Sequence, residues 1–113
     1  MSAETLRQKQ SRFALMAARL ILQAQAMGYE VTLGEAYRSP AEAARLAAAG
    51  RGIARSLHTD RLAIDLNLFK NGRYLDSTED HRPLGEWWES IGGTWGGRFK
   101  DGNHYSLAHE GRK

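Results

Sequence analysis

The sequence contains no cysteine among its 113 residues. Disulfide bonds and zinc sites built from thiolates are therefore excluded, and any metal must be bound by histidine and carboxylate side chains. A chain of this length buries roughly two-thirds of its surface on folding, so it does not need a metal merely to fold. A metal in this protein is therefore expected to be catalytic rather than structural.

Long hydrophobic runs are also absent. No stretch approaches the roughly 18 consecutive apolar residues of a membrane span. We therefore expect no membrane-spanning helix. Residues 1–10 lack the cationic start and apolar run of a secretory signal peptide. The sequence therefore predicts a protein that is made and kept in the cytoplasm.

The chain has little net charge, +3, with an isoelectric point near 9.5. This balance favours anionic surroundings, but the basic and aromatic residues are not interleaved as in a groove that binds single strands. Nucleic acid is therefore not an expected partner. The length leaves room for one domain, residues 1–113.

Three segments have the pattern of helices. Residues 5–27 repeat apolar side chains at three- and four-residue steps and are followed by Gly28. Ser39-Pro40-Ala41-Glu42 is a capping sequence that opens a helix to about residue 49. A third helix follows the polar residues 76–80 and ends at Gly92-Gly93.

Strands are predicted between these helices. Residues 30–37 and 62–69 alternate apolar and polar side chains, and residues 104–107 form a last short strand. Asn71-Gly72 is typical of a two-residue hairpin turn, which gives the strand at 62–69 an antiparallel neighbour at 73–75. We therefore predict an α+β fold with a small antiparallel β-sheet and packed helices.

Four side chains form a candidate catalytic site. His58, Asp65 and His104 supply the three protein ligands of a hydrolytic zinc centre, which keeps a fourth position open. Asp101 stands beside them and is free to move a proton. In one extended strand the side chains of His58 and Asp65 would lie about 23 Å apart, so the chain must fold back near residues 59–61.

Arg38 is the candidate for stabilising an oxyanion. It is expected at the end of the first strand, where a guanidinium is held rigidly enough to clamp a developing negative charge. The alternative is a surface arginine that is paired with Glu35 or Glu42. His81 and His109 are interpreted as surface residues without a role.

These residues lie in motifs that resemble those of the M15 zinc peptidases. The matching segments are Tyr37-Arg38-Ser39, Ser56-x-His58-x5-Ala63-x-Asp65, Gly92-Gly93-x-Trp95 and Asp101-x-x-His104. The chain is most similar to the branch with phage endolysins that act as L-alanyl-D-glutamate peptidases. Position 101 supports that branch, because the carboxypeptidases and dipeptidases of the family usually have glutamate there. Two positions depart from the pattern: Arg61, where many members have glycine, and Ser106, where an acidic residue or glutamine is common.

The resemblance implies a hedgehog and DD-peptidase-like fold with Zn²⁺ on His58, Asp65 and His104, the catalytic carboxylate Asp101 and the transition-state arginine Arg38. It implies hydrolysis of the L-alanyl-D-glutamate bond in the peptidoglycan stem, by an endolysin that reaches the cell wall after holin-dependent release. The expected partner is bacterial peptidoglycan, and the protein is expected to be a monomer without a separate cell-wall-binding domain. Two alternatives stay open: a D-Ala-D-Ala carboxypeptidase or dipeptidase, and a non-catalytic wall-binding or phage structural module.

Overall fold

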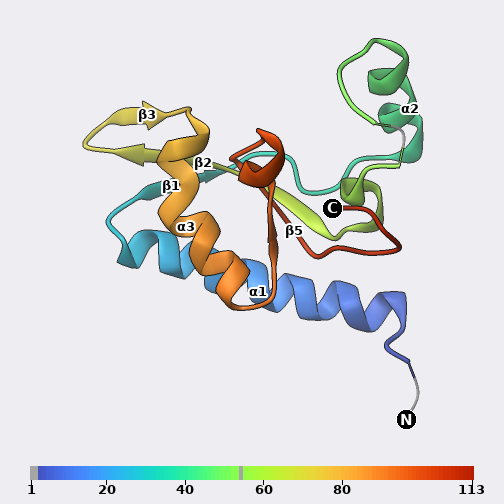
Figure 1. Ribbon diagram of the computed structural model, residues 1–113, viewed down its shortest axis with the longest axis horizontal. Coiled ribbons are helices and arrows are strands. Elements are labelled where there is room, and N and C mark those ends of the chain that lie inside the picture. The colour runs from blue at the N-terminus through green and yellow to red at the C-terminus, as the bar shows by residue number, and fades with distance from the viewer. Residues whose placement is uncertain (1–2, 54) are drawn as a thin grey trace.

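The computed structural model describes residues 3–53 and 55–113 and confirms the α+β fold. Residues 1, 2 and 54 lie outside the described residues. Within this part of the chain the helices and strands follow each other as shown in Figure 1. They are α1 (Leu6–Ala26), β1 (Glu30–Leu33), α2 (Pro40–Ala48), β2 (Ala63–Lys70), β3 (Arg73–Leu75), α3 (Thr78–Ser90), β4 (Thr94–Trp95) and β5 (His104–Ser106). Two 3₁₀ turns, Leu57–Asp60 and Gly96–Phe99, precede β2 and β5.

The sheet is antiparallel and is centred on β2. Its strand order is β1-β2-β5-β4, and β3 also pairs with β2. The hairpin from β2 to β3 turns at Asn71 and Gly72, which both have positive φ, as a type I′ turn requires. β2 is the longest strand, and its first half pairs with β5. The residues at this end of β2 therefore lie beside the C-terminal part of the chain.

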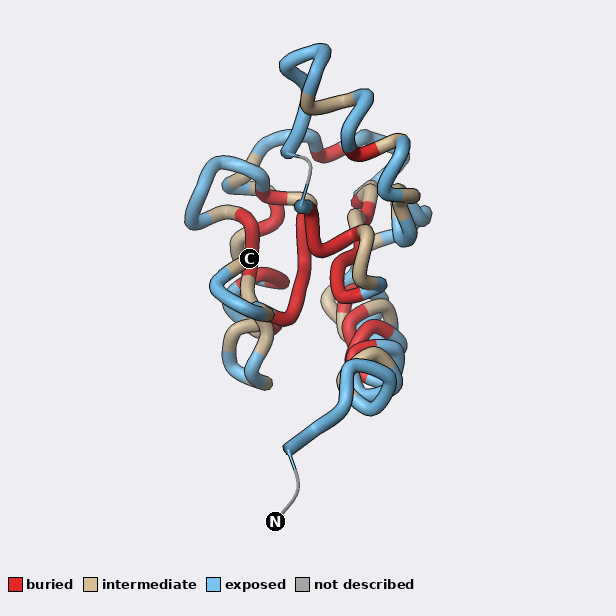
Figure 2. The backbone as a smooth tube through the Cα atoms, turned by 90° about the vertical axis from the view of Figure 1, so that its right-hand side faces the viewer, coloured by how far each residue is buried: buried red, intermediate tan, exposed pale blue. Residues whose placement is uncertain are grey.

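The core lies where α1 and α3 pack against the sheet. Figure 2 shows the buried stretches gathered in the middle of the molecule, with α1 buried along one side only. That side is the predicted apolar stripe, since Phe13, Met16 and Leu20 are all buried. The largest fully buried side chains are Trp88, Trp95 and Tyr105, from α3, β4 and β5. These aromatic rings hold the two C-terminal strands against α3.

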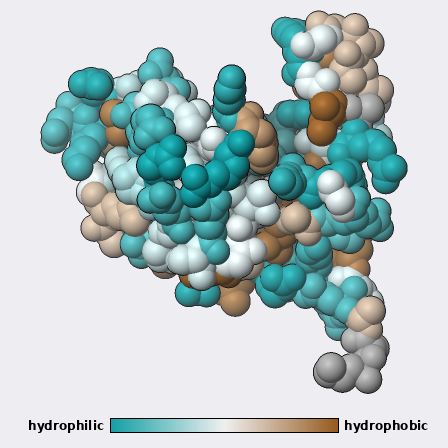
Figure 3. All heavy atoms as spheres, in the orientation of Figure 1, coloured by the Kyte–Doolittle hydropathy of each residue, from teal (hydrophilic) through white to brown (hydrophobic). Residues whose placement is uncertain are grey.

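The second helix, α2, lies apart from α1 and α3 (Figure 1). It begins as predicted, with the Ser39 side chain accepting a hydrogen bond from the Glu42 N–H at 3.1 Å. Only Ala43 is buried. In the space-filling view, weakly apolar residues lie beside hydrophilic ones in the region of α2 (Figure 3). Among the described residues no helix is sufficiently long and apolar to cross a bilayer.

The first strand is shorter than predicted. β1 ends at Leu33, whose side chain is 65% exposed rather than core-facing. Gly34 comes so close to β2 that a Cβ on it would lie 3.0 Å from the Cβ of Asp65. The chain then leaves the regular register, because Gly34 donates to the Asp65 carbonyl while Glu35 accepts from the Asp65 N–H, each at 2.8 Å. Arg38 consequently lies on a loop, and its predicted place at a strand end is wrong.

The interpretation of His81 as a surface residue is also wrong. His81 lies on the inner face of α3 and is only 2% exposed. Its Nδ1 is 2.7 Å from the hydroxyl of Tyr105 in β5. The helix repeat places position 81 next to the predicted stripe, three residues before the buried Leu84, so the polar side chain was buried with a polar partner.

Candidate active site

Two of the predicted ligands face each other across the sheet. Asp65 on β2 and His104 on β5 are direct partners in the antiparallel register. Directly opposite residues on one face have Cβ atoms about 5 Å apart, so their side chains meet without any loop rearrangement. The Asp65 Oδ1 lies 3.6 Å from the His104 Nδ1.

The third predicted ligand, His58, reaches the same place from a tight turn. It lies in the 3₁₀ turn Leu57–Asp60, which is capped by the Ser56 side chain and followed by Arg61 in the left-handed conformation, φ +57°. This turn is the predicted fold-back between His58 and Asp65. It brings the His58 Nε2 to 3.3 Å from the Asp65 Oδ1.

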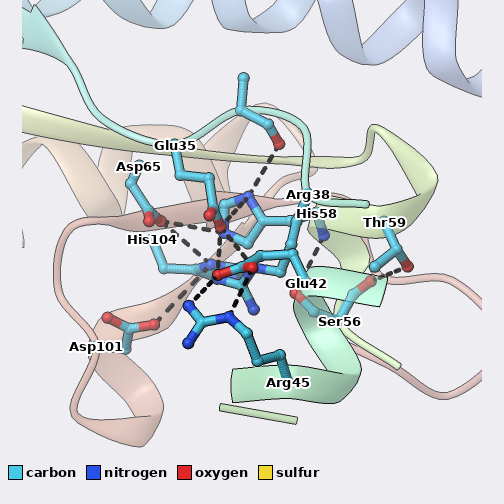
Figure 4. A network of polar contacts seen from close by, with 11 residues as sticks. Glu35, Arg38, Glu42, Arg45, Ser56, His58, Thr59, Asp65, Asp101 and His104 are labelled. Carbon is cyan, nitrogen blue, oxygen red and sulfur yellow. Dashed lines mark hydrogen bonds and ion pairs between the residues drawn. The ribbon is translucent and has the colours of Figure 1, made fainter. Parts of the chain in front are cut away.

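The three ligand atoms form a compact group, all within 4.8 Å of one another (Figure 4). The His58 Nδ1 is 3.0 Å from the Ala36 carbonyl and donates to it, which leaves the lone pair of Nε2 facing the group. On His104 it is Nδ1 that faces Asp65, while Nε2 is buried without a hydrogen-bond partner among the described residues. Two imidazole nitrogens and one carboxylate oxygen suit a zinc ion with an open position.

The charges in this group support metal binding. Burial raises the pKa of Asp65, but the neighbouring His104 and His58 rings outweigh this effect and lower that pKa to about 2. Asp65 is therefore ionised throughout the physiological range. Burial lowers the pKa of His58, but Asp65, the Ala36 carbonyl and Glu35 together raise it above its ordinary value. The negative charge of Asp65 thus lies next to both imidazole rings.

Asp101 lies beside the ligand group without belonging to it. Its Oδ2 is 3.9 Å from the His104 Nδ1, and its side chain is 53% exposed (Figure 4). Partial burial, followed by the negative charge of Asp65, raises the pKa of Asp101 and outweighs the nearby cationic groups. A raised pKa suits a group that exchanges protons during a reaction.

The loop that carries Asp101 depends on Gly96. A Cβ at position 96 would overlap the Asp101 carbonyl oxygen and lie 2.7 Å from the His104 Cβ. The Asp101 N–H also donates to the Gly96 carbonyl at 2.9 Å. The glycine therefore permits a close approach of backbone to backbone. Gly96 and Gly97 form the second of the two glycine pairs that precede Asp101.

Arg38 is paired with Glu35, as the alternative interpretation expected, but it is not a surface residue, because its side chain is only 14% exposed. Its Nε donates to the Glu35 Oε1 at 2.8 Å, yet its side chain lines the same cleft as the ligand group. Glu35 also lies 3.7 Å from the His58 Nδ1, so one carboxylate orients the arginine and faces a ligand. From the sequence, Glu35 was expected only as a partner of a surface arginine, and its three-residue spacing from Arg38 was the available signal.

The cleft has a volume of about 330 Å³. Besides the predicted residues, its lining includes four side chains that the sequence analysis missed: Arg51, Ile53, Phe99 and Lys113. The two positions that depart from the M15 pattern do not line it. Arg61 stacks over the Tyr37 ring at 4.1 Å, and Ser106 is fully buried in β5.

A family model for M15 peptidases, described as D-alanyl-D-alanine carboxypeptidase, matches residues 49–107. The chain belongs to the M15 peptidase family. The matched segment carries all three members of the ligand group and Asp101, whereas Arg38 lies before it. This result confirms the family resemblance that the motifs predicted.

A solved structure supports the fold of this M15 peptidase independently. The L-Ala D-Glu endopeptidase ChiX of Serratia marcescens is similar with a TM-score of 0.67 and 22% sequence identity. The similarity covers 80% of this chain and 77% of the other. No curated protein matches the chain significantly.

Proposed function

We propose that this M15 peptidase is a zinc enzyme that hydrolyses the L-alanyl-D-glutamate bond in the peptidoglycan stem peptide. The observation that carries the proposal is the ligand group His58, Asp65 and His104 with Asp101 beside it. The name of the Serratia structure and the aspartate at position 101 both favour this bond. The description of the family model favours the D-Ala-D-Ala bond, which is the second candidate.

The residues present fit a zinc ion. His58 Nε2, Asp65 Oδ1 and His104 Nδ1 would hold it, and the hydrogen bond to Ala36 keeps the first of these atoms unprotonated. When bound, zinc lowers the pKa of a water molecule toward 7 and polarises a carbonyl group. Asp65, with its pKa of about 2, remains an anionic ligand under all physiological conditions.

Asp101 is proposed as the proton-transfer group. Its raised pKa and its exposed position at the cleft allow its carboxylate to accept a proton from the attacking water. The same proton then passes to the leaving amine when the carbon–nitrogen bond breaks. One carboxylate therefore serves as base and then as acid, and ends the cycle in its starting state.

Arg38 is proposed as the oxyanion partner. Glu35 accepts from its Nε and leaves other N–H groups of the guanidinium available to the cleft. An arginine that is only 14% exposed and already oriented needs little reorganisation as negative charge develops on the scissile carbonyl oxygen. Glu35→Gln is expected to lower kcat by about tenfold with a smaller change in KM, because it loosens the arginine without removing it.

The decisive experiment is the digestion of purified peptidoglycan, with the products identified by mass. Cleavage of the proposed bond exposes the amino group of D-glutamate, whereas the second candidate releases D-alanine. Activity is expected to disappear with a chelator and to return with added zinc. Activity that survives the chelator would contradict the metal mechanism, and release of D-alanine would select the second candidate.

The matched variants are Asp101→Asn and Asp76→Asn. Asp76 is an exposed carboxylate in the connection from β3 to α3, so its variant controls for the loss of one negative charge. Asp101→Asn is expected to lower kcat by about 10²- to 10⁴-fold and to leave zinc binding within a few-fold of the wild type. An equally active Asp101→Asn protein would exclude the proposed proton transfer. Normal wall binding without any turnover at saturating zinc would favour a non-catalytic module.

The proposal extends to a biological role as a phage-type lysin that stays in the cytoplasm until the membrane is opened. Expression in a bacterial host tests it directly. Lysis is expected only when a holin is co-expressed or the membrane is permeabilised. Lysis without permeabilisation would show that the protein reaches the wall by another route.

A further inference from the structure

The cleft holds more positive charge than its proposed chemistry uses. Arg38, Arg51 and Lys113 line it together with Asp65 and Asp101. A bound divalent ion would add two further positive charges. Such a cleft favours a substrate that carries negative charge close to the scissile bond.

Arg51 is an arginine of this cleft that forms no ion pair with a carboxylate among the described residues. Arg38 is engaged by Glu35 at 2.8 Å, and Glu42 is engaged by Arg45 at 2.9 Å. Arg51 and Lys113 form no ion pair within residues 3–53 and 55–113. A guanidinium at the cleft therefore retains all of its donors for a ligand.

The end of α2 fixes the position of Arg51. The helix closes with Gly50 at φ +72°, and two hydrogen bonds complete the turn: the Gly50 N–H to the Ala47 carbonyl at 3.0 Å and the Arg51 N–H to the Leu46 carbonyl at 2.8 Å. This pair of bonds is a Schellman motif, which anchors the residue after the glycine. The backbone of Arg51 is therefore fixed by hydrogen bonds to the end of α2.

Gly52, the residue after Arg51, lies close to the side chain of Arg38. Gly52 has ordinary van der Waals room, and a Cβ on it would lie 3.6 Å from the Nη1 of Arg38. The backbone beside Arg51 thus passes close to the guanidinium of the proposed oxyanion partner. Because Arg38 and Arg51 also line the same cleft, a group bound by Arg51 would lie in the cleft that contains the ligand group.

The proposed substrate offers a group of this kind. In the stem peptide the chain continues through the γ-carboxyl of D-glutamate, so its α-carboxylate is free and sits on the carbon bonded to the leaving nitrogen. We infer that Arg51 binds this α-carboxylate and makes the enzyme select the charged form of the stem peptide. The planar guanidinium suits the two oxygens of a carboxylate better than the ammonium of Lys113. This inference rests on the proposed function, since it assigns a specificity residue within the same site.

The test compares two synthetic N-acylated L-Ala-D-Glu peptides that differ only at the α position, one with a carboxylate and one with a carboxamide. The zinc-loaded wild type is expected to favour the carboxylate by at least about tenfold in kcat/KM. Arg51→Gln should reduce this preference to within about twofold, mainly by raising KM for the carboxylate peptide. Its kcat/KM for the carboxamide peptide should stay within about twofold, which a merely misfolded variant would not achieve.

Lys113→Gln and Arg51→Lys are the matched controls. Lys113→Gln removes a cation from the same cleft and is expected to keep most of the preference, while Arg51→Lys should restore part of it. If Lys113→Gln abolishes the preference and Arg51→Gln does not, the assignment to Arg51 is overturned. Equal cleavage of both peptides by the wild type also overturns it but leaves the proposed function intact. If neither peptide is cleaved, the proposed function fails, and equal binding of the two peptides by calorimetry would overturn the inference separately.

Discussion

The buried pair of His81 and Tyr105 predicts a loss of stability on mild acidification. Burial of His81 lowers its pKa from 6.5 to about 4, against a smaller opposite effect of Asp80. The difference of about 2.5 pH units corresponds to an upper bound of about 3 kcal/mol, at 1.36 kcal/mol per unit. This is a large part of the 5–15 kcal/mol that is typical of a whole domain.

The direction of the pH dependence follows from the protonation state of His81 that the folded protein prefers. The folded state holds His81 neutral, so the unfolded chain binds the proton more tightly. The stabilisation is complete above about pH 6.5 and is lost as the pH falls toward about 4. Urea unfolding at intervals between pH 7.5 and 4.5, in excess chelator, measures this loss without a contribution from metal release.

Two variants separate His81 from other titrating groups. His81→Gln retains an acceptor for the Tyr105 hydroxyl but does not titrate, so its free energy of unfolding should fall less steeply with pH than that of the wild type. We expect the wild type to lose about 2–3 kcal/mol more than this variant over the range. Tyr105→Phe removes the hydrogen bond but keeps the imidazole, and should retain the steep fall. Parallel curves for the wild type and His81→Gln would refute the reasoning.

Two further predictions concern backbone geometry near the site. Gly96→Ala forces a Cβ onto the Asp101 carbonyl oxygen, so it should destabilise the protein by about 1–3 kcal/mol and lower kcat by about 10²-fold through displacement of Asp101 and His104. Thermal unfolding and peptidoglycan turnover would measure both, and a normal kcat in the Gly96→Ala protein would contradict the role of this contact. Arg61→Gly should be about 1 kcal/mol more stable than Arg61→Ala in urea unfolding, since both lose the stacking on Tyr37 but only glycine relieves the left-handed backbone. Equal stabilities would show that position 61 carries no backbone strain.

Sequence patterns predicted those helices, turns and strands that are determined by neighbouring residues. The helix cap at Ser39, the hairpin at Asn71-Gly72 and the alternation along β2 all depend on neighbouring residues, and each is confirmed. The contact between Asp65 and His104 could be predicted for a related reason. Once both residues lie on adjacent antiparallel strands, the register alone brings them together.

Contacts between distant segments produced the errors. Alternating apolar residues predicted a strand as far as residue 37, but Gly34 meets the backbone of Asp65 thirty-one positions away, and this contact ends the strand. His81 was assigned to the surface because its partner Tyr105 is supplied by β5. The contact of Gly34 leaves no signal in the neighbouring residues. The three-residue spacing from Leu84 places His81 beside the buried stripe of its helix, but it does not reveal Tyr105 as the partner.

The segment that departs from the predicted strand is also the one that assembles the site. Residues 34–38 form four hydrogen bonds with two members of the ligand group, Asp65 and His58. Gly34 and Glu35 bond the backbone of Asp65, the Ala36 carbonyl accepts from the His58 ring, and the Arg38 N–H donates to the His58 carbonyl at 3.1 Å. Because the chain breaks register at Gly34, one short loop fixes the orientation of His58, holds Asp65 opposite it and places Arg38 beside both.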